Sequence, residues 1–273
     1  MTGSSPEGQR RPPHRLDSGL AHWARVWNYL LGGKDNFAAD REAGDMILQR
    51  FPGIIDTARE QRGFLVRAVR FLAAEAGIRQ FLDIGVGLPV GASTHQVAQQ
   101  LAPEPRVVYV DSDPLVLVRA RALLASAPGG MSSYIEAGVR DTGEILEQAA
   151  RTLDFGQPVA VMMLGILGQI PDAAGPGAIV TRLLGPLPAG SYLALSDGTD
   201  TSPSANHAIA VYNSHSAASS YHLRSPGQIA GFFEGLELVP PGVVATTRWR
   251  PEIRDLESEP REVPAICGVG RKP

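Results

Sequence analysis

The segment from Phe81 to Pro89 constrains what this chain can fold into more than any other. It begins as an apolar run, broken only by Asp83, and it turns at Gly85 and Gly87. Such a run is typical of a buried parallel strand, and glycines in the following turn let backbone amides approach a ligand that a Cβ would push away. The next residues, Ser93 to Gln96, have the spacing of a capping box at the start of a helix. We therefore predict a strand, a ligand-binding loop and a helix in succession.

A second buried strand is expected over residues 106–111, and it ends in the carboxylate of Asp111. The carboxyl ends of adjacent parallel strands meet at one edge of a sheet. A carboxylate at that edge can accept hydrogen bonds from both hydroxyls of a ribose. The pattern predicts a nucleoside site that includes Gly85, Gly87, Asp111 and the adjoining Ser112.

The spacing of the glycines distinguishes between nucleosides. A dinucleotide site carries G-x-G-x-x-G and places a pyrophosphate at the start of the helix. Here the third glycine is Gly91, and Pro89 lies inside the loop. Asp83, two residues before the first glycine, would repel a pyrophosphate but suits a ligand that carries an ammonium and a sulfonium group. We therefore expect S-adenosylmethionine (SAM) as the cofactor, and an NAD-type oxidoreductase is the weaker alternative.

Composition argues against several other classes of protein. With 273 residues, 44% of them hydrophobic and 19% charged, the chain has the composition of one soluble globular domain with an extension. Its formal net charge of −3 provides no general attraction for nucleic acid or an anionic membrane. No apolar stretch approaches the length of a membrane span, and no signal peptide is evident at the N-terminus. We expect a cytoplasmic protein.

Metal binding is not expected. The single cysteine, Cys267, excludes an intramolecular disulfide and a cysteine-rich metal site, and its apolar neighbours predict a buried thiol. His207, His215 and His222 cluster near the end of the chain, but no two of them are four residues apart, as ligands on one helix face would be. We expect these histidines to be solvated or to contact a substrate.

The order of strand and helix signals predicts an α/β fold. Strands are expected near 80–84, 106–111, 132–137, 158–164, 191–196, 236–247 and 263–269, and helices near 20–31, 38–50, 56–76, 93–102, 114–126, 142–152, 176–185, 204–216 and 225–233. We divide the chain into a disordered tail (1–15), an N-terminal helical lid (16–55) and a SAM-binding domain (56–273). The double glycine Gly32-Gly33 is the expected flexible point of the lid.

Three segments lie in one characteristic order along the chain: Arg25–Phe37, Gln80–Pro89 and Val108–Pro114. Together with Phe233–Gly242 and Arg248–Pro251, they resemble a family of S-adenosyl methyltransferases of unassigned substrate that is widespread in actinobacteria. The resemblance extends over most of the chain, from Leu20 to Arg271. It implies a Rossmann-like class I methyltransferase fold, with a seven-stranded, mostly parallel sheet that ends in an antiparallel strand pair. It also implies SAM as the cofactor and a helical cap at the N-terminus, but it does not identify the methyl acceptor.

Two positions depart from what this resemblance leads us to expect. Gly138 follows the third strand where the family tends to carry an aspartate, and Gly168 follows the fourth strand where we expect a histidine. Asp141 remains near the first position and can accept a hydrogen bond from the adenine amino group. Asp141 and Glu144 also have the spacing of a capping box.

Two interpretations of the function are therefore compatible with the sequence. The first is a SAM-dependent methyltransferase that acts on a small molecule. The alternative is a non-catalytic module that binds SAM or its product S-adenosylhomocysteine (SAH) as a regulatory ligand. We assign no catalytic residue, because the sulfonium already activates the methyl group and alignment does most of the work. The sequence does not decide the oligomeric state, which is a monomer or a homodimer.

The carboxylate of SAM needs a cation or several amides. Arg59 and Arg62 lie on the helix that precedes the first strand, and a guanidinium can bind a carboxylate through two hydrogen bonds. Arg62, with Gly33 in the preceding loop, is the candidate that we carry forward. Asp113 is expected to cap the helix that begins at Pro114 and not to bind the ligand.

The acceptor is expected to meet three segments: the lid around Trp27 and Tyr29, the loop 165–170 and the segment 197–222. These segments offer aromatic, aliphatic, hydroxyl and imidazole groups but few basic ones, and a nucleic acid would need several phosphate contacts. We therefore expect a small, largely uncharged acceptor. Of Trp23 and Trp27, we expect one in the core and the other on a wall of the pocket.

Overall fold

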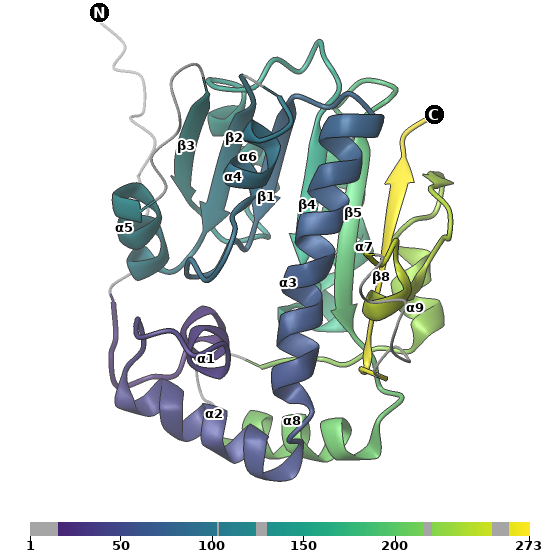
Figure 1. Cartoon of the computed structure of the whole chain (residues 1–273). Helices are drawn as coiled ribbons and strands as arrows, with labels where there is room; N and C mark the ends of the chain where they lie inside the picture. The colour runs from purple at the N-terminus through teal and green to yellow at the C-terminus, as the bar shows by residue number, and fades with distance from the viewer. Residues whose placement is uncertain (1–15, 103, 124–129, 216–219, 253–261) are drawn as a thin grey trace, which may run out of the picture.

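A single mixed sheet organises the molecule (Figure 1). The computed structural model describes residues 16–102, 104–123, 130–215, 220–252 and 262–273, so the predicted tail (1–15) lies outside the described residues. The strands follow the order β3-β2-β1-β4-β5-β8-β6, and β7 pairs with β8. Their bounds are β1 Gln80–Ile84, β2 Arg106–Asp111, β3 Met131–Glu136, β4 Ala160–Leu164, β5 Tyr192–Gly198, β6 Glu237–Leu238, β7 Val244–Ala245 and β8 Ala265–Arg271.

The first five strands are parallel, and β8 runs antiparallel to β5, β6 and β7. This arrangement confirms the predicted mostly parallel sheet with an antiparallel end. The first two strands are almost continuously apolar because helices cover both of their faces. Cys267 on β8 is fully buried, as predicted, and burial raises the pKa of its thiol.

The helices form a layer on each side of the sheet (Figure 1). Their bounds are α1 Trp23–Leu30, α2 Ala38–Arg50, α3 Ile54–Arg70, α4 Thr94–Gln99, α5 Pro114–Leu123, α6 Thr142–Ala149, α7 Pro176–Leu184, α8 Pro203–His215 and α9 Pro226–Gly231. One apolar core joins α6, α7 and α9 to the sheet, and a second core joins α3, α4 and α5 to the other face. The expected helix at 56–76 continues from α3 as a π-helical turn, Phe71–Glu75.

The prediction of a single strand at 236–247 is wrong. The structure has two short strands there, β6 and β7, and both pair with β8. Pro240 and Pro241 lie between them, and proline has no N–H to donate to a neighbouring strand. The sheet accordingly has eight strands and not the expected seven.

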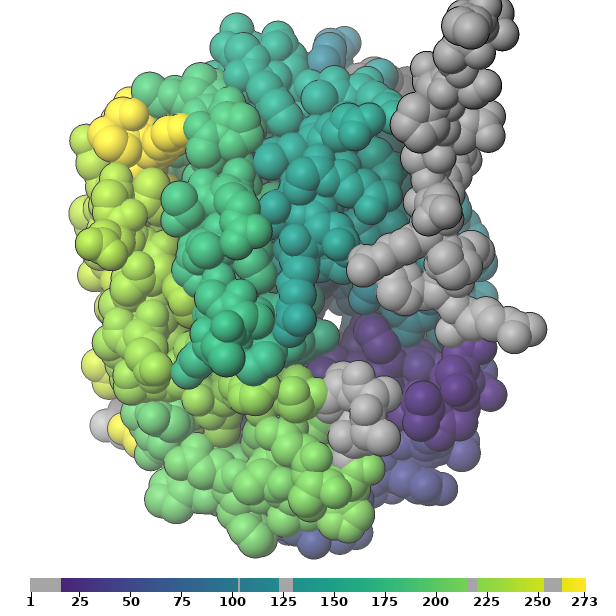
Figure 2. Space-filling model, turned by 180° about the vertical axis from the view of Figure 1, so that it is seen from behind, coloured from purple at the N-terminus to yellow at the C-terminus, as the bar shows by residue number. Residues whose placement is uncertain are grey.

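A third apolar core lies beyond the carboxyl ends of the parallel strands. It joins α1 and α2 to α8, the helix that follows β5, through side chains that include Trp23, Ile47, Ile209 and Tyr212. Figure 2 shows, from behind, the purple N-terminal segment and the green segment after β5 together at one end of the molecule. Segments far apart in the sequence therefore build this end jointly. In the part of the chain that the structure describes, no helix is long and apolar enough to span a bilayer.

The packing of α2 against α8 predicts the effect of truncating Ile47, which is fully buried there. Ile47→Ala should lower the free energy of unfolding by about 2–5 kcal/mol, because it removes buried methyl groups and leaves a cavity. Urea titration followed by tryptophan fluorescence measures the change. Val118→Ala is the matched control, because Val118 is 58% exposed and its truncation should change stability by less than about 0.5 kcal/mol. Equal stability of the two variants would contradict the packing.

Candidate functional site

A cavity of about 570 Å³ lies between the carboxyl ends of the parallel strands and the N-terminal helices. Its size is in the range of small-molecule sites, roughly 300–1,000 Å³. Seven of the eight predicted binding residues line it: Arg62, Asp83, Gly85, Gly87, Asp111, Ser112 and Asp141. These residues come from α3, β1, β2 and the loops that follow the first three strands, so the fold brings distant segments together at one site.

Gly33 is the predicted residue that does not line the cavity. It packs behind Asn28, and a Cβ at Gly33 would lie 2.2 Å from the Asn28 amide nitrogen. Asn28 itself is buried and lies on the cavity wall. Its side-chain oxygen accepts hydrogen bonds from Asp35 N and Asn36 Nδ2, both at 3.0 Å. The double-glycine turn is therefore held by Asn28 of α1, whose side chain also borders the cavity.

The two glycines of the first loop have different roles. Gly85 has φ +72°, and a Cβ there would lie 2.6 Å from Cδ1 of Ile166, in the loop after β4. Gly87 has φ +65°, but a Cβ there would meet no atom within 4 Å. Gly85 thus allows two loops to pack closely, whereas Gly87 leaves open space at the cavity where a ligand can approach the backbone.

Asp111 joins the ends of β1 and β2. Its Oδ2 accepts a hydrogen bond from Gly87 N at 3.0 Å, and its Oδ1 accepts one from Asp113 N at 2.9 Å. The side chain is buried, and this burial raises the pKa of the carboxyl. Two carboxylate oxygens offer about four acceptor positions, so two remain for the hydroxyls of a ligand.

Asp83 lies at the base of the same cavity. Thr94 Oγ1 donates a hydrogen bond to its Oδ2 at 2.6 Å, which ties β1 to the start of α4. Burial raises the pKa of Asp83 to about 6, and the Thr94 hydrogen bond and the Arg62 guanidinium oppose that rise. Asp83 is therefore a carboxylate at neutral pH whose environment penalises its charge, and a cationic ligand would relieve the penalty.

Arg62 reaches the cavity from α3. It donates a hydrogen bond to the carbonyl oxygen of Ala92 at 2.7 Å, and burial lowers the pKa of its guanidinium, with Asp83 acting against that shift. Arg59, the other arginine considered, is exposed and lies 3.8 Å from Asp56 in a surface ion pair. On the cavity wall, Arg62 and the carboxylates of Asp83 and Asp111 together suit a ligand with a carboxylate, an ammonium and ribose hydroxyls.

The structure explains the departure at Gly138. A Cβ at this position would lie 3.2 Å from Oδ2 of Asp141, so the Asp141 carboxylate lies next to the backbone that the expected aspartate would occupy. Asp141 takes the N-cap position of α6, but its side chain makes no capping hydrogen bond to the helix. The capping box expected with Glu144 is therefore wrong. The Asp141 side chain instead borders the cavity.

The departure at Gly168 also has a structural explanation. A Cβ at Gly168 would lie 2.2 Å from Cζ of Tyr221, so the tyrosine ring occupies the space beside this glycine. Tyr221 lines the cavity and donates a hydrogen bond to Oδ1 of Asp197 at the end of β5. Burial raises the pKa of Asp197 to about 6, and Arg224, 3.8 Å from its other oxygen, opposes the rise. A polar aromatic residue thus fills the place left open after the fourth strand.

His22 and Gln61 are among the cavity residues that sequence reasoning missed. Gln61 is 5% exposed, and its Oε1 would lie 2.9 Å from a Cβ at Gly165. The sequence did contain a signal for Gln61, because this polar residue has helical spacing from Phe64 and Leu65, on the buried face of α3. His22 precedes α1 and gave no comparable signal.

The remaining candidates fall outside the cavity or on its edge. His207, His215 and His222 do not line it, and nowhere in the described ranges do three potential metal-ligating side chains gather. Trp23 belongs to the apolar core that joins α1, α2 and α8, whereas Trp27 is half-buried, and both border the cavity. Asp113 caps α5 as predicted, because its Oδ1 accepts a hydrogen bond from Leu115 N at 2.9 Å.

This chain resembles several proteins of known structure in sequence and fold. A DUF574 family protein from Streptomyces avermitilis is 42% identical, with a TM-score of 0.89 over 95% of this chain and 100% of that one. A candidate methyltransferase from Thermobifida fusca is 41% identical, with a TM-score of 0.84 over 93% of this chain and 96% of that one. A SAM-dependent methyltransferase from Anabaena variabilis is 13% identical, with a TM-score of 0.50 over 92% and 93% of the two chains, and it shows the fold alone.

No protein of curated function matches this chain. The two actinobacterial structures cover nearly the whole chain at more than 40% identity. The likeness therefore includes the strand ends, the loops and the N-terminal helices that form the cavity. The model of the S-adenosyl methyltransferase family matches residues 9–273, and this chain therefore belongs to that family and is a SAM-dependent methyltransferase.

Proposed function

We propose that the cavity binds SAM across the ends of β1, β2 and β3. In this proposal Asp111 accepts hydrogen bonds from the ribose hydroxyls, and Asp141 accepts one from the adenine amino group. Asp83 faces the ammonium and Arg62 the carboxylate of the methionine part. The observation that carries the proposal is the Asp111 carboxylate, which two backbone amides orient and which still has acceptor positions free. Ser112 completes this edge.

Bound SAM supplies a methyl group that its sulfonium already activates. The chain then has to align an acceptor and exclude water. Apolar and aromatic residues, including Trp27, Ile166, Ile170 and Tyr221, supply walls for this purpose. Gln61 brings one amide into the cavity beside Gly165, where it can orient a polar group of the acceptor. Such a chamber suits a small molecule with an apolar body and few polar groups.

The acceptor that we propose is a small, largely uncharged molecule and not a nucleic acid. Among the residues that line the cavity, the arginines are Arg62 and Arg140, and Arg62 is assigned to the cofactor. Nucleic acid binding depends on several phosphate contacts made by basic side chains. The loop 165–170 contributes to the cavity as expected, whereas the segment 197–222 contributes Tyr221.

We also propose that residues 16–55 act as a lid over a cofactor-binding domain made of residues 56–273. Support comes from α1, which contributes Trp23 and Trp27 to the cavity wall. The lid shares an apolar core with α8, so opening would have to separate α1 and α2 from that helix or carry it along. Movement of lids over bound substrates is a common way to exclude water from a reaction.

Replacing Asp111 tests its proposed role as the residue that binds the ribose hydroxyls. Asp111→Ala should weaken SAH binding by about 2–4 kcal/mol, because two charge-assisted hydrogen bonds are lost. Isothermal titration calorimetry measures the affinity. Asp200→Ala is the control, because Asp200 is exposed and does not line the cavity, and it should bind SAH like the unmodified protein. Unchanged affinity of Asp111→Ala would refute the ribose assignment.

The pKa of Asp83 predicts a pH dependence of cofactor binding. Because burial raises this pKa to about 6, Asp83 becomes neutral as the pH falls through that value and loses its attraction for the ligand's ammonium. SAH affinity should therefore be constant from about pH 7 to 8 and should fall by up to about tenfold per unit below pH 6. Asp83→Asn should bind weakly at every pH and show a flatter profile. An equally steep profile in that variant would assign the dependence to another group.

Methyl transfer from labelled SAM tests the acceptor class. Transfer RNA, ribosomal RNA, DNA and a fractionated pool of small metabolites serve as acceptors, each with an Asp111→Ala control. We expect label in the metabolite pool alone. Label in a nucleic acid that disappears as salt is raised would contradict the small-molecule acceptor. SAH binding without transfer to any fraction would favour the non-catalytic alternative.

A further inference from the structure

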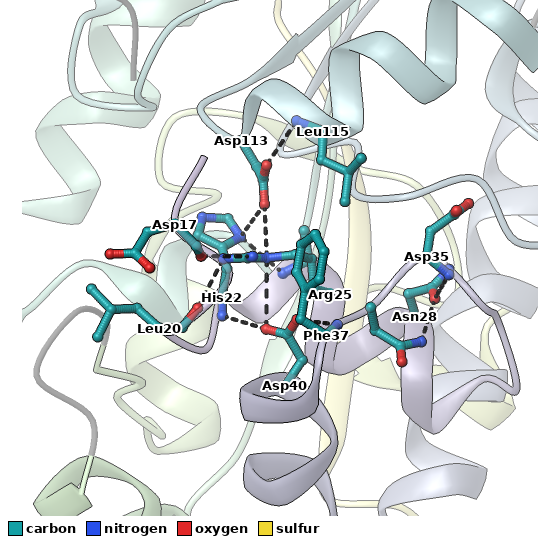
Figure 3. A network of polar contacts seen from close by, with 12 residues as sticks. Asp17, Leu20, His22, Arg25, Asn28, Asp35, Phe37, Asp40, Asp113 and Leu115 are labelled. Carbon is teal, nitrogen blue, oxygen red and sulfur yellow. Dashed lines mark hydrogen bonds and ion pairs between the residues drawn. The ribbon is translucent and has the colours of Figure 1, made fainter. Parts of the chain in front are cut away.

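A cluster of buried charges joins the lid to the end of β2 (Figure 3). Arg25 of α1 lies 3.2 Å from Oδ2 of Asp113 and 3.6 Å from Oδ1 of Asp40. All three residues are at most 4% exposed. The guanidinium also donates hydrogen bonds to the carbonyl oxygens of Asp17 and Leu20, at 2.9 and 3.0 Å. One arginine thus faces a carboxylate of the lid and a carboxylate of the core.

The two carboxylates of this cluster differ in how well they are satisfied. Asp40 accepts hydrogen bonds from the backbone amides of His22 and Phe37, at 2.9 and 2.8 Å. Asp113 uses Oδ1 to cap α5, but its Oδ2 is buried and receives no well-aligned hydrogen bond from the described residues. A buried carboxylate with an unpaired oxygen is costly, and the charge of Arg25 at 3.2 Å offsets part of that cost.

His22 lies against this oxygen. Its Nδ1 lies 3.3 Å from Asp113 Oδ2. The same nitrogen accepts a hydrogen bond from the backbone amide of Ala24 at 3.4 Å. A ring nitrogen that accepts a hydrogen bond carries no proton, so the proton of the ring is on Nε2, which is then a donor.

The ring of His22 also lines the cavity, and its side chain is 27% exposed. Among the described residues, no hydrogen-bond partner of Nε2 is found. The ring lies close to the proposed ribose-binding edge, because Asp113, which lies 3.3 Å from its Nδ1, also donates its backbone amide to Oδ1 of Asp111. One short segment, 111–113, therefore positions both the proposed ribose acceptor and a histidine of the lid.

We infer that His22 is a nucleoside-binding residue, whose Nε2 donates a hydrogen bond to a hydroxyl oxygen or a ring nitrogen of the cofactor's adenosine part. The inference rests on the proposed binding of SAM at Asp111 and extends it to the lid. Asp113 and Arg25 act as positioning residues, since they hold the ring and its backbone against β2. The cofactor site is then completed by a residue that precedes α1 and lies in a different segment from the other binding residues.

Calorimetry with two probes tests the inference. SAH carries the adenosine and the amino-acid part, whereas 5′-methylthioadenosine carries the adenosine part alone. Asn in place of histidine can keep an acceptor for the Ala24 amide near Nδ1 and removes Nε2. His22→Asn should therefore keep the melting temperature of the unmodified protein and bind both probes about tenfold more weakly, the effect of losing one hydrogen bond. His22→Gln, which can place an amide donor near Nε2, should recover part of the affinity.

A variant of the residue proposed to bind the amino-acid part of SAH provides a contrast to the His22 variants. Arg62→Ala should weaken SAH binding more than methylthioadenosine binding, whereas the His22 variants should weaken both by the same factor. Unchanged binding of both probes by His22→Asn would overturn the inference, and so would a loss confined to SAH. If the unmodified protein bound neither probe, the proposed cofactor site itself would be wrong, which is a different result from a failure at His22.

Discussion

The two hydrogen bonds that Asp111 accepts hold the functional end of this molecule together. Gly87 N ties its Oδ2 to the loop after β1, and Asp113 N ties its Oδ1 to the turn before α5. Without Gly87 in a left-handed conformation, the loop amide would not point at the carboxylate. Without the carboxylate, two buried amides would lose their acceptor. The loop, the strand end and the start of the helix therefore depend on one side chain, which is also the one proposed to bind ribose.

Charge is concentrated at this end of the sheet, although burial works against it. Asp83, Asp111 and Asp113 are all at most 6% exposed, and the pKa values of the first two are raised by burial. Buried ion pairs contribute little net stability, but removing one partner leaves an uncompensated charge and is strongly destabilising. Arg25 is such a partner, because it lies between Asp113 and Asp40. The electrostatics thus hold α1 against the end of β2 and favour a cationic ligand in the cavity.

The space beside Gly138 and Gly168, where we expected an aspartate and a histidine, is filled by neighbouring side chains. Asp141 places its carboxylate beside Gly138, and Tyr221 lies against Gly168 with its hydroxyl bonded to Asp197. In both cases the substituting side chain comes from a later segment of the chain. The loss of a side chain at one position of a loop therefore does not empty the site, because a nearby backbone without a Cβ leaves room for another residue. This supports turnover over passive binding.

The sequence by itself determined the parallel sheet, most helices and the residues at the strand ends that line the cavity. Those features follow from local patterns: apolar runs, glycine turns and carboxylates at strand ends, all of which act within a few residues. It did not determine that the strand expected at 236–247 would break at Pro240-Pro241. It also gave no sign that Gly33 would lie behind Asn28, or that His22 would reach the cavity. Only the tertiary structure decided these points, because contacts between α1, α3, α8 and the strand ends join residues whose separation in sequence carries no pattern.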